Sequence, residues 1–194
     1  MILPLKINTD IPGWTKISKL KLLAHAAMQV QENGCIVEIG SFNGRSSYAM
    51  GANKLPGVEL HCFDSWSDTS GKCIAEIYGL MFGDLTQVND YKSFRHNMKE
   101  VDYLLKINTD IPSPETRLNK VIDLMFIDAA HDNVDVINEL FDNWVINVRS
   151  GGTIIFDDYD KETWPMLVEI IDHQVATGNF TAVHTMDLAI LYKI

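Results

Sequence analysis

The stretch that decides the fold spans residues 35–46 and reads CIVEIGSFNGRS. Residues 35–39 are mostly apolar and rich in β-branched side chains, which is typical of a strand buried within a parallel sheet. Gly40 then allows a sharp turn and a close approach of a ligand to the backbone, and Gly44 allows a helix to begin near the sheet. Free N–H groups at the start of such a helix can bind polar ligand atoms. The stretch therefore predicts either a ligand-binding turn or an ordinary connection from strand to helix.

Outward from this turn, strand-like and helix-like segments alternate, which predicts a doubly wound α/β domain. Apolar spacing predicts helices over 17–33, 45–54, 133–148 and 161–177. Strands are expected over 35–39, 58–63, 103–107, 122–127 and 153–156, with two more within 180–194 on either side of Met186 and Asp187. We therefore expect one domain over residues 1–194: a mostly parallel seven-stranded sheet with helices on both faces and a C-terminal antiparallel hairpin.

Composition narrows the function to the handling of small molecules. The formal net charge of −10 and the lack of a Lys and Arg cluster argue against a nucleic-acid partner. The apolar runs are too short for a membrane span, and the N-terminal residues do not resemble a secretory signal. Cys35 and Cys62 lie in expected strands, as small buried side chains of a cytoplasmic protein would.

Two features interrupt the regular alternation. Residues 66–101 are too many for a simple crossover, so this segment is expected to be either a lid that selects the substrate or an extra helix or two. The eight residues Leu5 to Pro12 recur unchanged at Leu105 to Pro112, and one such pair does not make a repeat protein.

Two observations refine the ligand expected at the first turn. A third glycine, which the dinucleotide-binding pattern requires, is missing after Gly44. Asp64 ends the next expected strand, where a carboxylate can accept hydrogen bonds from both hydroxyls of a ribose. The pattern thus favours a nucleoside-containing ligand other than a dinucleotide.

Together, four motifs resemble those of the class I S-adenosylmethionine-dependent methyltransferases. The closest likeness is to the small-molecule O-methyltransferase branch of the macrocin O-methyltransferase type. Residues 37–47 look like the first motif of the family and residues 63–66 like the second, while 127–132 and 151–159 look like the two later ones. The resemblance implies a Rossmann-like methyltransferase fold.

The resemblance also implies where the cofactor S-adenosylmethionine binds. Glu38 and Gly40 would lie beside its methionine moiety, Asp64 would hold the ribose, and the region around Asp110 would face the adenine. The full set expected to contact the cofactor is Glu38, Gly40, Ser41, Phe42, Gly44, Ser46, Asp64, Ser65, Trp66, Asp110 and Asp128.

A second set of polar residues follows two later strands and comprises Asp128, His131, Asp132, Asp157 and Asp158. Parallel strands end at one edge of a sheet, so these carboxylates would repel one another unless protonated or bridged by a cation. Metal-dependent O-methyltransferases place acidic or amide ligands at the matching positions, which predicts Mg²⁺ or another divalent cation on Asp128, Asp157 and Asp158. The alternative is that Asp128 caps a helix or contacts the cofactor while the pair is a solvated strand end.

His131 has three interpretations: a general base, a metal ligand, or a structural histidine. As a base, with Asp128 beside it in the catalytic site, it would take the proton of the acceptor hydroxyl. The expected function is therefore methyl transfer to a hydroxyl oxygen of a small molecule, by a protein that can form a homodimer. The alternatives are an oxidoreductase or hydroxylase on a related fold and a non-catalytic module that binds the cofactor.

Overall fold

The computed structural model describes residues 4–64, 66, 91–107, 118, 120–129, 131 and 133–194, with the backbone alone for 104–107. The expected lid segment therefore lies mostly outside the described residues, and Ser65, Asp110 and Asp132 lie outside them entirely.

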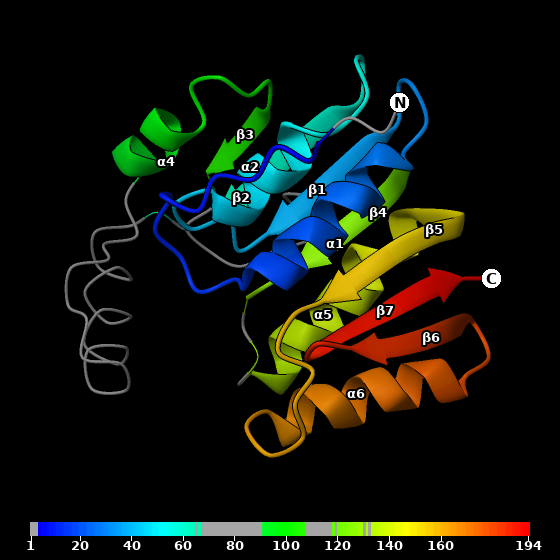
Figure 1. Ribbon diagram of the computed structural model, residues 1–194. Coiled ribbons are helices and arrows are strands. Elements are labelled where there is room, and N and C mark those ends of the chain that lie inside the picture. Colours follow the sequence, from blue (N-terminus) through cyan, green and yellow to red (C-terminus); the bar gives the residue numbers. More distant parts are fainter. Residues whose placement is uncertain are drawn as a thin grey trace.

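Within the described residues, seven strands form one sheet in the order β3-β2-β1-β4-β5-β7-β6 (Figure 1). The strands are β1 Cys35–Ile39, β2 Glu59–Asp64, β3 Leu104–Ile107, β4 Ile122–Ile127, β5 Val148–Phe156, β6 Phe180–Thr185 and β7 Leu188–Lys193. The pairings β1–β2, β1–β4, β2–β3 and β4–β5 are parallel, whereas β7 runs antiparallel to both β5 and β6. The expected sheet and its terminal hairpin are confirmed.

Helices cover both faces of the sheet, as a doubly wound fold requires. On one face, α1 (Ile17–Met28) and α2 (Arg45–Gly51) share a core with β1, β2 and β4. On the other, α5 (Val134–Asn143) and α6 (Pro165–Ala176) pack on β4, β5 and β7. Figure 1 shows α1 in front of the central strands and α6 beside the β6–β7 hairpin. The short helices α4 (Tyr91–Asn97) and η2 (Val145–Asn147) complete the described elements.

Several boundaries differ from the expected ones, and turn residues explain them. Helix α1 ends at Met28 with Gln29 as its C-cap, and the left-handed φ of 62° at Asn33 shows that the helix does not reach the expected end. Strand β5 begins at Val148, which pairs with Ile122 before the register shifts at a β-bulge. Gly151, with a φ of 72°, lies in this irregular stretch. Helix α6 begins at Pro165, whose missing N–H is tolerated in the first turn.

Three backbone hydrogen bonds align the carboxyl ends of the central strands. The Gly40 N–H donates to the Phe63 carbonyl, the Asp128 N–H to the Ile39 carbonyl and the Asp157 N–H to the Ile127 carbonyl, each at 2.9 Å. The residues that follow β1, β4 and β5 are therefore neighbours along one edge. This edge is where open α/β sheets bind ligands.

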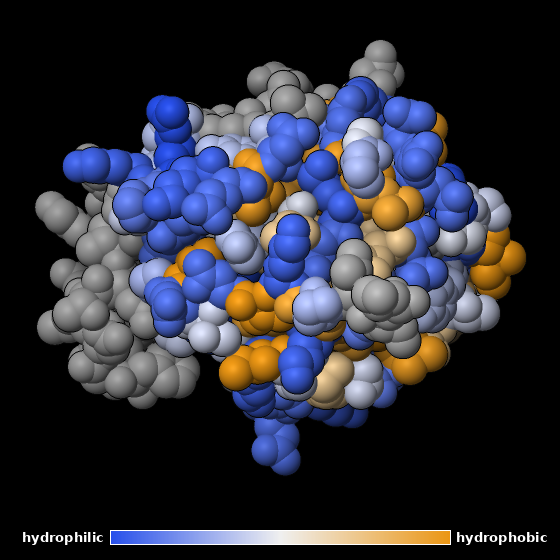
Figure 2. Space-filling view, turned by 45° about the horizontal axis from the view of Figure 1, so that its top comes forward, coloured by the Kyte–Doolittle hydropathy of each residue, from blue (hydrophilic) through white to orange (hydrophobic). Residues whose placement is uncertain are grey.

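The described surface is mixed in character. On the face seen in Figure 2, hydrophobic residues lie in small groups separated by hydrophilic ones, which is ordinary for a globular protein. Among the described residues, no helix combines the length and apolar character that crossing a membrane requires.

Candidate active site

Glu38 lies at the end of β1 with its carboxylate fully buried. The Ser41 hydroxyl donates to its Oε2 atom at 2.7 Å, and the Ser47 hydroxyl donates to the same atom. Burial raises the pKa of Glu38 to about 7, although hydrogen bonds from nearby serines oppose the rise. Its Oε1 atom has no hydrogen-bond partner among the described residues. An unused buried acceptor of this kind fits a ligand that brings its own donor, such as an ammonium group.

The turn after β1 depends on its two glycines for different reasons. Gly40 has a φ of 92°, and a Cβ atom there would overlap the carbonyl oxygen of Asp128. Gly44 has a φ of 91°, and its close neighbours are Phe94 and Met98 at α4 rather than the sheet. The first glycine thus lets the turn after β1 touch the end of β4, and the second makes room for α4.

Asp64 braces the same turn. Its Oδ2 atom accepts a hydrogen bond from the Phe42 N–H at 2.8 Å, and its Oδ1 atom accepts one from the Trp66 N–H at 3.2 Å. The carboxylate is half-buried, and a carboxylate oxygen can accept more than one hydrogen bond. The expected ribose-binding residue therefore also fixes the backbone of the first motif.

The two tryptophans near this turn take different positions. Trp66 is buried against Phe94, and its indole N–H donates to the Phe42 carbonyl at 2.7 Å. Trp14 is 41% exposed, and its ring centroid lies 4.8 Å from that of Phe42. Trp66 therefore covers core, and Trp14 borders the turn from the N-terminal segment.

The acidic edge gathers most of the expected metal and catalytic residues. The Nε2 atom of His131 lies 3.6 Å from Asp128 Oδ1 and 3.4 Å from Asp158 Oδ2. One ligand atom from each of these three residues lies within 4.8 Å of the others. The third expected ligand, Asp157, is instead buried in an ion pair with Lys19 from α1. The structure thus brings His131 into the group of possible metal ligands and pairs Asp157 elsewhere.

Burial and mutual repulsion set the charges of this edge. Burial raises the pKa of Asp128 above its ordinary range, and the nearby Asp157 and Asp158 add to the rise while His131 opposes it. Burial and the charge of Asp157 likewise raise the pKa of Asp158. Burial lowers the pKa of His131, but the surrounding carboxylates outweigh it, so this pKa lies above its usual value. The carboxylates therefore favour the protonated form of the imidazole, and their own pKa values lie above the ordinary range for aspartate.

Lys19 is the residue that sequence reasoning missed. It lies on the buried face of α1 together with Leu20 and Leu23. A lysine on the apolar stripe of an amphipathic helix was the available signal, because a lysine is rarely buried unless it is paired.

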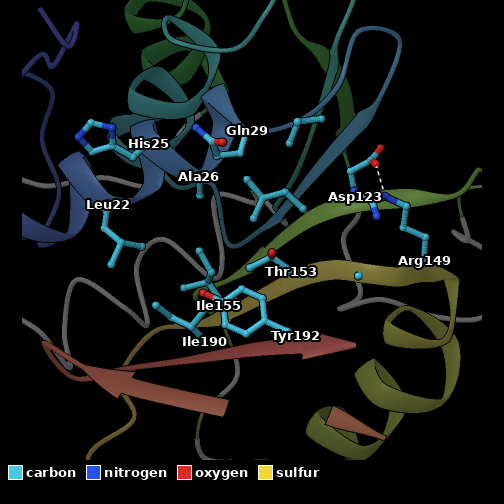
Figure 3. Close-up of a pocket in the computed structure, with 13 residues that line it drawn as sticks. Leu22, His25, Ala26, Gln29, Asp123, Arg149, Thr153, Ile155, Ile190 and Tyr192 are labelled. Carbon is cyan, nitrogen blue, oxygen red and sulfur yellow. Dashed lines mark hydrogen bonds and ion pairs between the residues drawn. The ribbon is translucent and has the colours of Figure 1, made fainter. Parts of the chain in front are cut away.

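A cavity of about 430 Å³ lies away from this edge, between α1 and the sheet (Figure 3). Its wall includes Asp123 and Arg149, which form an ion pair at the amino ends of β4 and β5. None of the predicted site residues lines it. The cavity is therefore separate from the turn after β1 and from the acidic edge.

Comparisons with known proteins bear on the family and the fold of this chain. A family model described as a methyltransferase domain matches residues 37–159, which is more than half of the chain. An uncharacterized protein of Acanthamoeba polyphaga mimivirus is 30% identical over 145 residues, which make up 72% of this chain and 58% of the viral protein. This chain thus spans less than two thirds of the length of that relative.

Solved structures share the fold at low sequence identity. A proposed O-methyltransferase from Klebsiella pneumoniae has a TM-score of 0.71 and 17% identity, with 95% of this chain and 84% of that chain covered. The O-methyltransferase from Bacillus cereus in complex with SAH has a TM-score of 0.62 at 17% identity and 95% and 85% coverage. TomG from Streptomyces achromogenes, in complex with SAM, has a TM-score of 0.60 at 17% identity and 95% and 82% coverage.

The chain belongs to the methyltransferase-domain family, and its fold is that of the Rossmann-like methyltransferases. The predicted membership of the methyltransferase family is confirmed, and proteins solved in complex with SAM or SAH share the fold of this chain. The macrocin-type branch is compatible with these matches and stays a prediction.

Proposed function

We propose that the chain transfers the methyl group of S-adenosylmethionine to a hydroxyl oxygen of a small-molecule acceptor at the carboxyl edge of the sheet. The observation that supports it best is the position of His131 between two carboxylates. Asp128, one of the two, also packs its carbonyl against Gly40 of the cofactor turn. A base and a cofactor turn on neighbouring strand ends are what methyl transfer to a hydroxyl requires.

Within this proposal, residues of the first two motifs hold the cofactor. The free Oε1 atom of Glu38 would accept a hydrogen bond from the cofactor ammonium, and Asp64 would accept those of the ribose hydroxyls. Five further residues build or border the same turn and would line the cofactor: Ser41, Phe42, Gly44, Ser46 and Trp66. Ser65 and Asp110, which lie outside the described residues, stay predicted cofactor contacts.

In the reaction, the acceptor hydroxyl would lose its proton to the imidazole of His131 as its oxygen attacks the methyl carbon. The oxygen–carbon bond forms while the carbon–sulfur bond breaks, and the sulfonium becomes the neutral thioether of S-adenosylhomocysteine. Asp128 and Asp158 would stabilise the imidazolium that results. The proton and the methyl group are thus both accounted for by named groups.

A divalent cation is a second part of the proposal. Asp128, Asp158 and His131 present two carboxylates and an imidazole close enough together to share an ion, which fits a cation such as Mg²⁺ or Mn²⁺. When bound, the cation would hold the acceptor oxygens and lower the pKa of the attacking hydroxyl. His131 would then be a ligand instead of the base, so the requirement for added metal separates the two roles.

The proposal is tested first by calorimetry with S-adenosylmethionine, S-adenosylhomocysteine and NAD. We expect both adenosyl compounds to bind and NAD not to bind, and absence of adenosyl binding would overturn the proposal. Transfer of a labelled methyl group to a panel of polyphenols and sugars, with Mg²⁺ or with a chelator, then identifies the acceptor class. Binding of the cofactor without transfer to any acceptor would favour a non-catalytic module.

Two further proposals concern the selection of the acceptor and the assembly of the protein. Acceptor selection is assigned to residues 66–101 together with the N-terminal segment that carries Trp14. A homodimer is the proposed assembly, and sedimentation of the purified protein tests it.

A further inference from the structure

The ammonium of Lys19 lies inside the acidic group at the carboxyl edge. Its side chain is 6% exposed, and that of its partner Asp157 is 5% exposed. The Nζ atom donates to Asp157 Oδ1 and lies 4.0 Å from Asp158 Oδ1. Helix α1 therefore delivers a positive charge to a strand end that is distant in sequence.

The three aspartates of this edge differ in the partners that their oxygens already have and in their exposure. Asp157 Oδ1 accepts the Lys19 ammonium and also the Asp158 N–H, the latter at 2.8 Å. Asp128 and Asp158 are 29% and 39% exposed and face His131. The imidazole is 10% exposed, and its Nδ1 atom has no hydrogen-bond partner among the described residues. The groups open to a ligand are thus Asp128, Asp158 and His131.

We propose that Lys19 is a positioning residue that occupies the cation position beside Asp157 and withdraws this carboxylate from any divalent cation. A metal at this edge is then held by two carboxylates and an imidazole rather than by three carboxylates. Two carboxylates attract a divalent cation less strongly than three, and the nearby ammonium repels it. This inference rests on the proposed function only in taking this edge as the acceptor site.

The test is a titration with Mn²⁺ alone, in which free Mn²⁺ is measured by electron paramagnetic resonance. Lys19→Met removes the ammonium and frees Asp157, so its Mn²⁺ affinity is expected to exceed that of the wild type by about tenfold or more. Lys19→Arg keeps the positive charge, so its Mn²⁺ affinity is expected to match that of the wild type. Equal affinity of the Met variant and the wild type, including no binding by either, would overturn the proposal.

Loss of the buried ammonium can also destabilise the fold, because Asp157 would keep an uncompensated charge. Thermal unfolding therefore accompanies the titration, and Mn²⁺ is expected to raise the Tm of Lys19→Met more than that of the wild type. A variant that stays unfolded at saturating Mn²⁺ would contradict the proposal, since a cation able to replace the ammonium should restore the fold.

A matched pair of variants tests whether Asp157 is a ligand. Where the wild type binds Mn²⁺, Asp158→Asn should weaken binding, whereas the double variant Lys19→Met with Asp157→Asn, which removes both charges of the buried pair, should change the affinity by less than about twofold. Equal weakening by both variants would show that Asp157 is a ligand and would refute the proposal. No methyl donor or acceptor enters these titrations, so their failure leaves the methyl-transfer proposal standing, and absence of cofactor binding leaves this inference standing.

Discussion

Glu38→Gln should make the cofactor-free protein more stable while it weakens cofactor binding. The carboxylate is fully buried and its pKa is raised to about 7 by that burial, from an ordinary 4.5. A raised pKa means that the folded state holds the proton more tightly than the unfolded state does. The contribution of Glu38 to stability is therefore full at acidic pH and is lost as the pH rises from 4.5 through 7.

The size of the effect follows from the same two pKa values. Complete loss of the stabilising contribution of Glu38 corresponds to about 3 kcal/mol of unfolding free energy and is reached near pH 8. About 1 kcal/mol of this contribution is already lost near pH 5. A glutamine has no charge to desolvate, and its carbonyl can accept the bonds from Ser41 and Ser47. The gain in unfolding free energy from Glu38→Gln should thus grow by about 2 kcal/mol between pH 5 and pH 8.

The assay is urea unfolding of wild type and variant at both pH values, without cofactor. Glu59→Gln is the matched control, because ion pairing with Lys120 and His61 lowers the pKa of Glu59 and its substitution should bring no gain at pH 8. Calorimetry should show weaker binding of S-adenosylmethionine to Glu38→Gln, since the ammonium loses its counter-charge. A variant equally stable relative to wild type at pH 5 and pH 8 would refute the reasoning.

Three further predictions concern the same site. Turnover should rise with pH through a pKa above 6.5, because the carboxylates raise the pKa of His131 and only the neutral ring accepts a proton. His131→Ala should lower kcat by about 10²–10⁴-fold and remove this pH dependence. Full turnover of this variant would exclude His131 as the general base. Asp64→Ala should cost about 1–3 kcal/mol of stability in chemical unfolding, because the Phe42 and Trp66 N–H groups lose their acceptor. The variant should also raise the Kd for the cofactor, and an unchanged Kd would exclude ribose binding by Asp64. Gly40→Ala should fail to accumulate as folded protein or lose about 3 kcal/mol or more of unfolding free energy, because its Cβ would overlap the Asp128 carbonyl at a left-handed φ. A thermal unfolding curve by circular dichroism like that of the wild type would contradict this prediction.

Much of the fold was predictable because its signals are local. The apolar run of β1 and that of β4 were placed at their observed bounds, since strands buried on both faces need little context. The hairpin turn at Met186 and Asp187 was predictable for the same reason, and both residues have a left-handed φ. The end of α1 and the start of β5 were missed, because helix ends are poorly marked in a sequence and the β-bulge near Gly151 depends on pairing with β4.

The candidate site divides in the same way. The sequence by itself determined that Glu38, Asp64, Asp128 and Asp157 lie at or just after the carboxyl ends of strands, and parallel strands end at one edge, so their meeting there was predictable. Only the tertiary structure decided how their charges are shared. The rotation of α1 on the sheet places Lys19 against Asp157, and His131 reaches Asp158 across two strand ends. These partners are set by how helices and loops pack, and packing depends on side chains far apart in the chain, which no local pattern records.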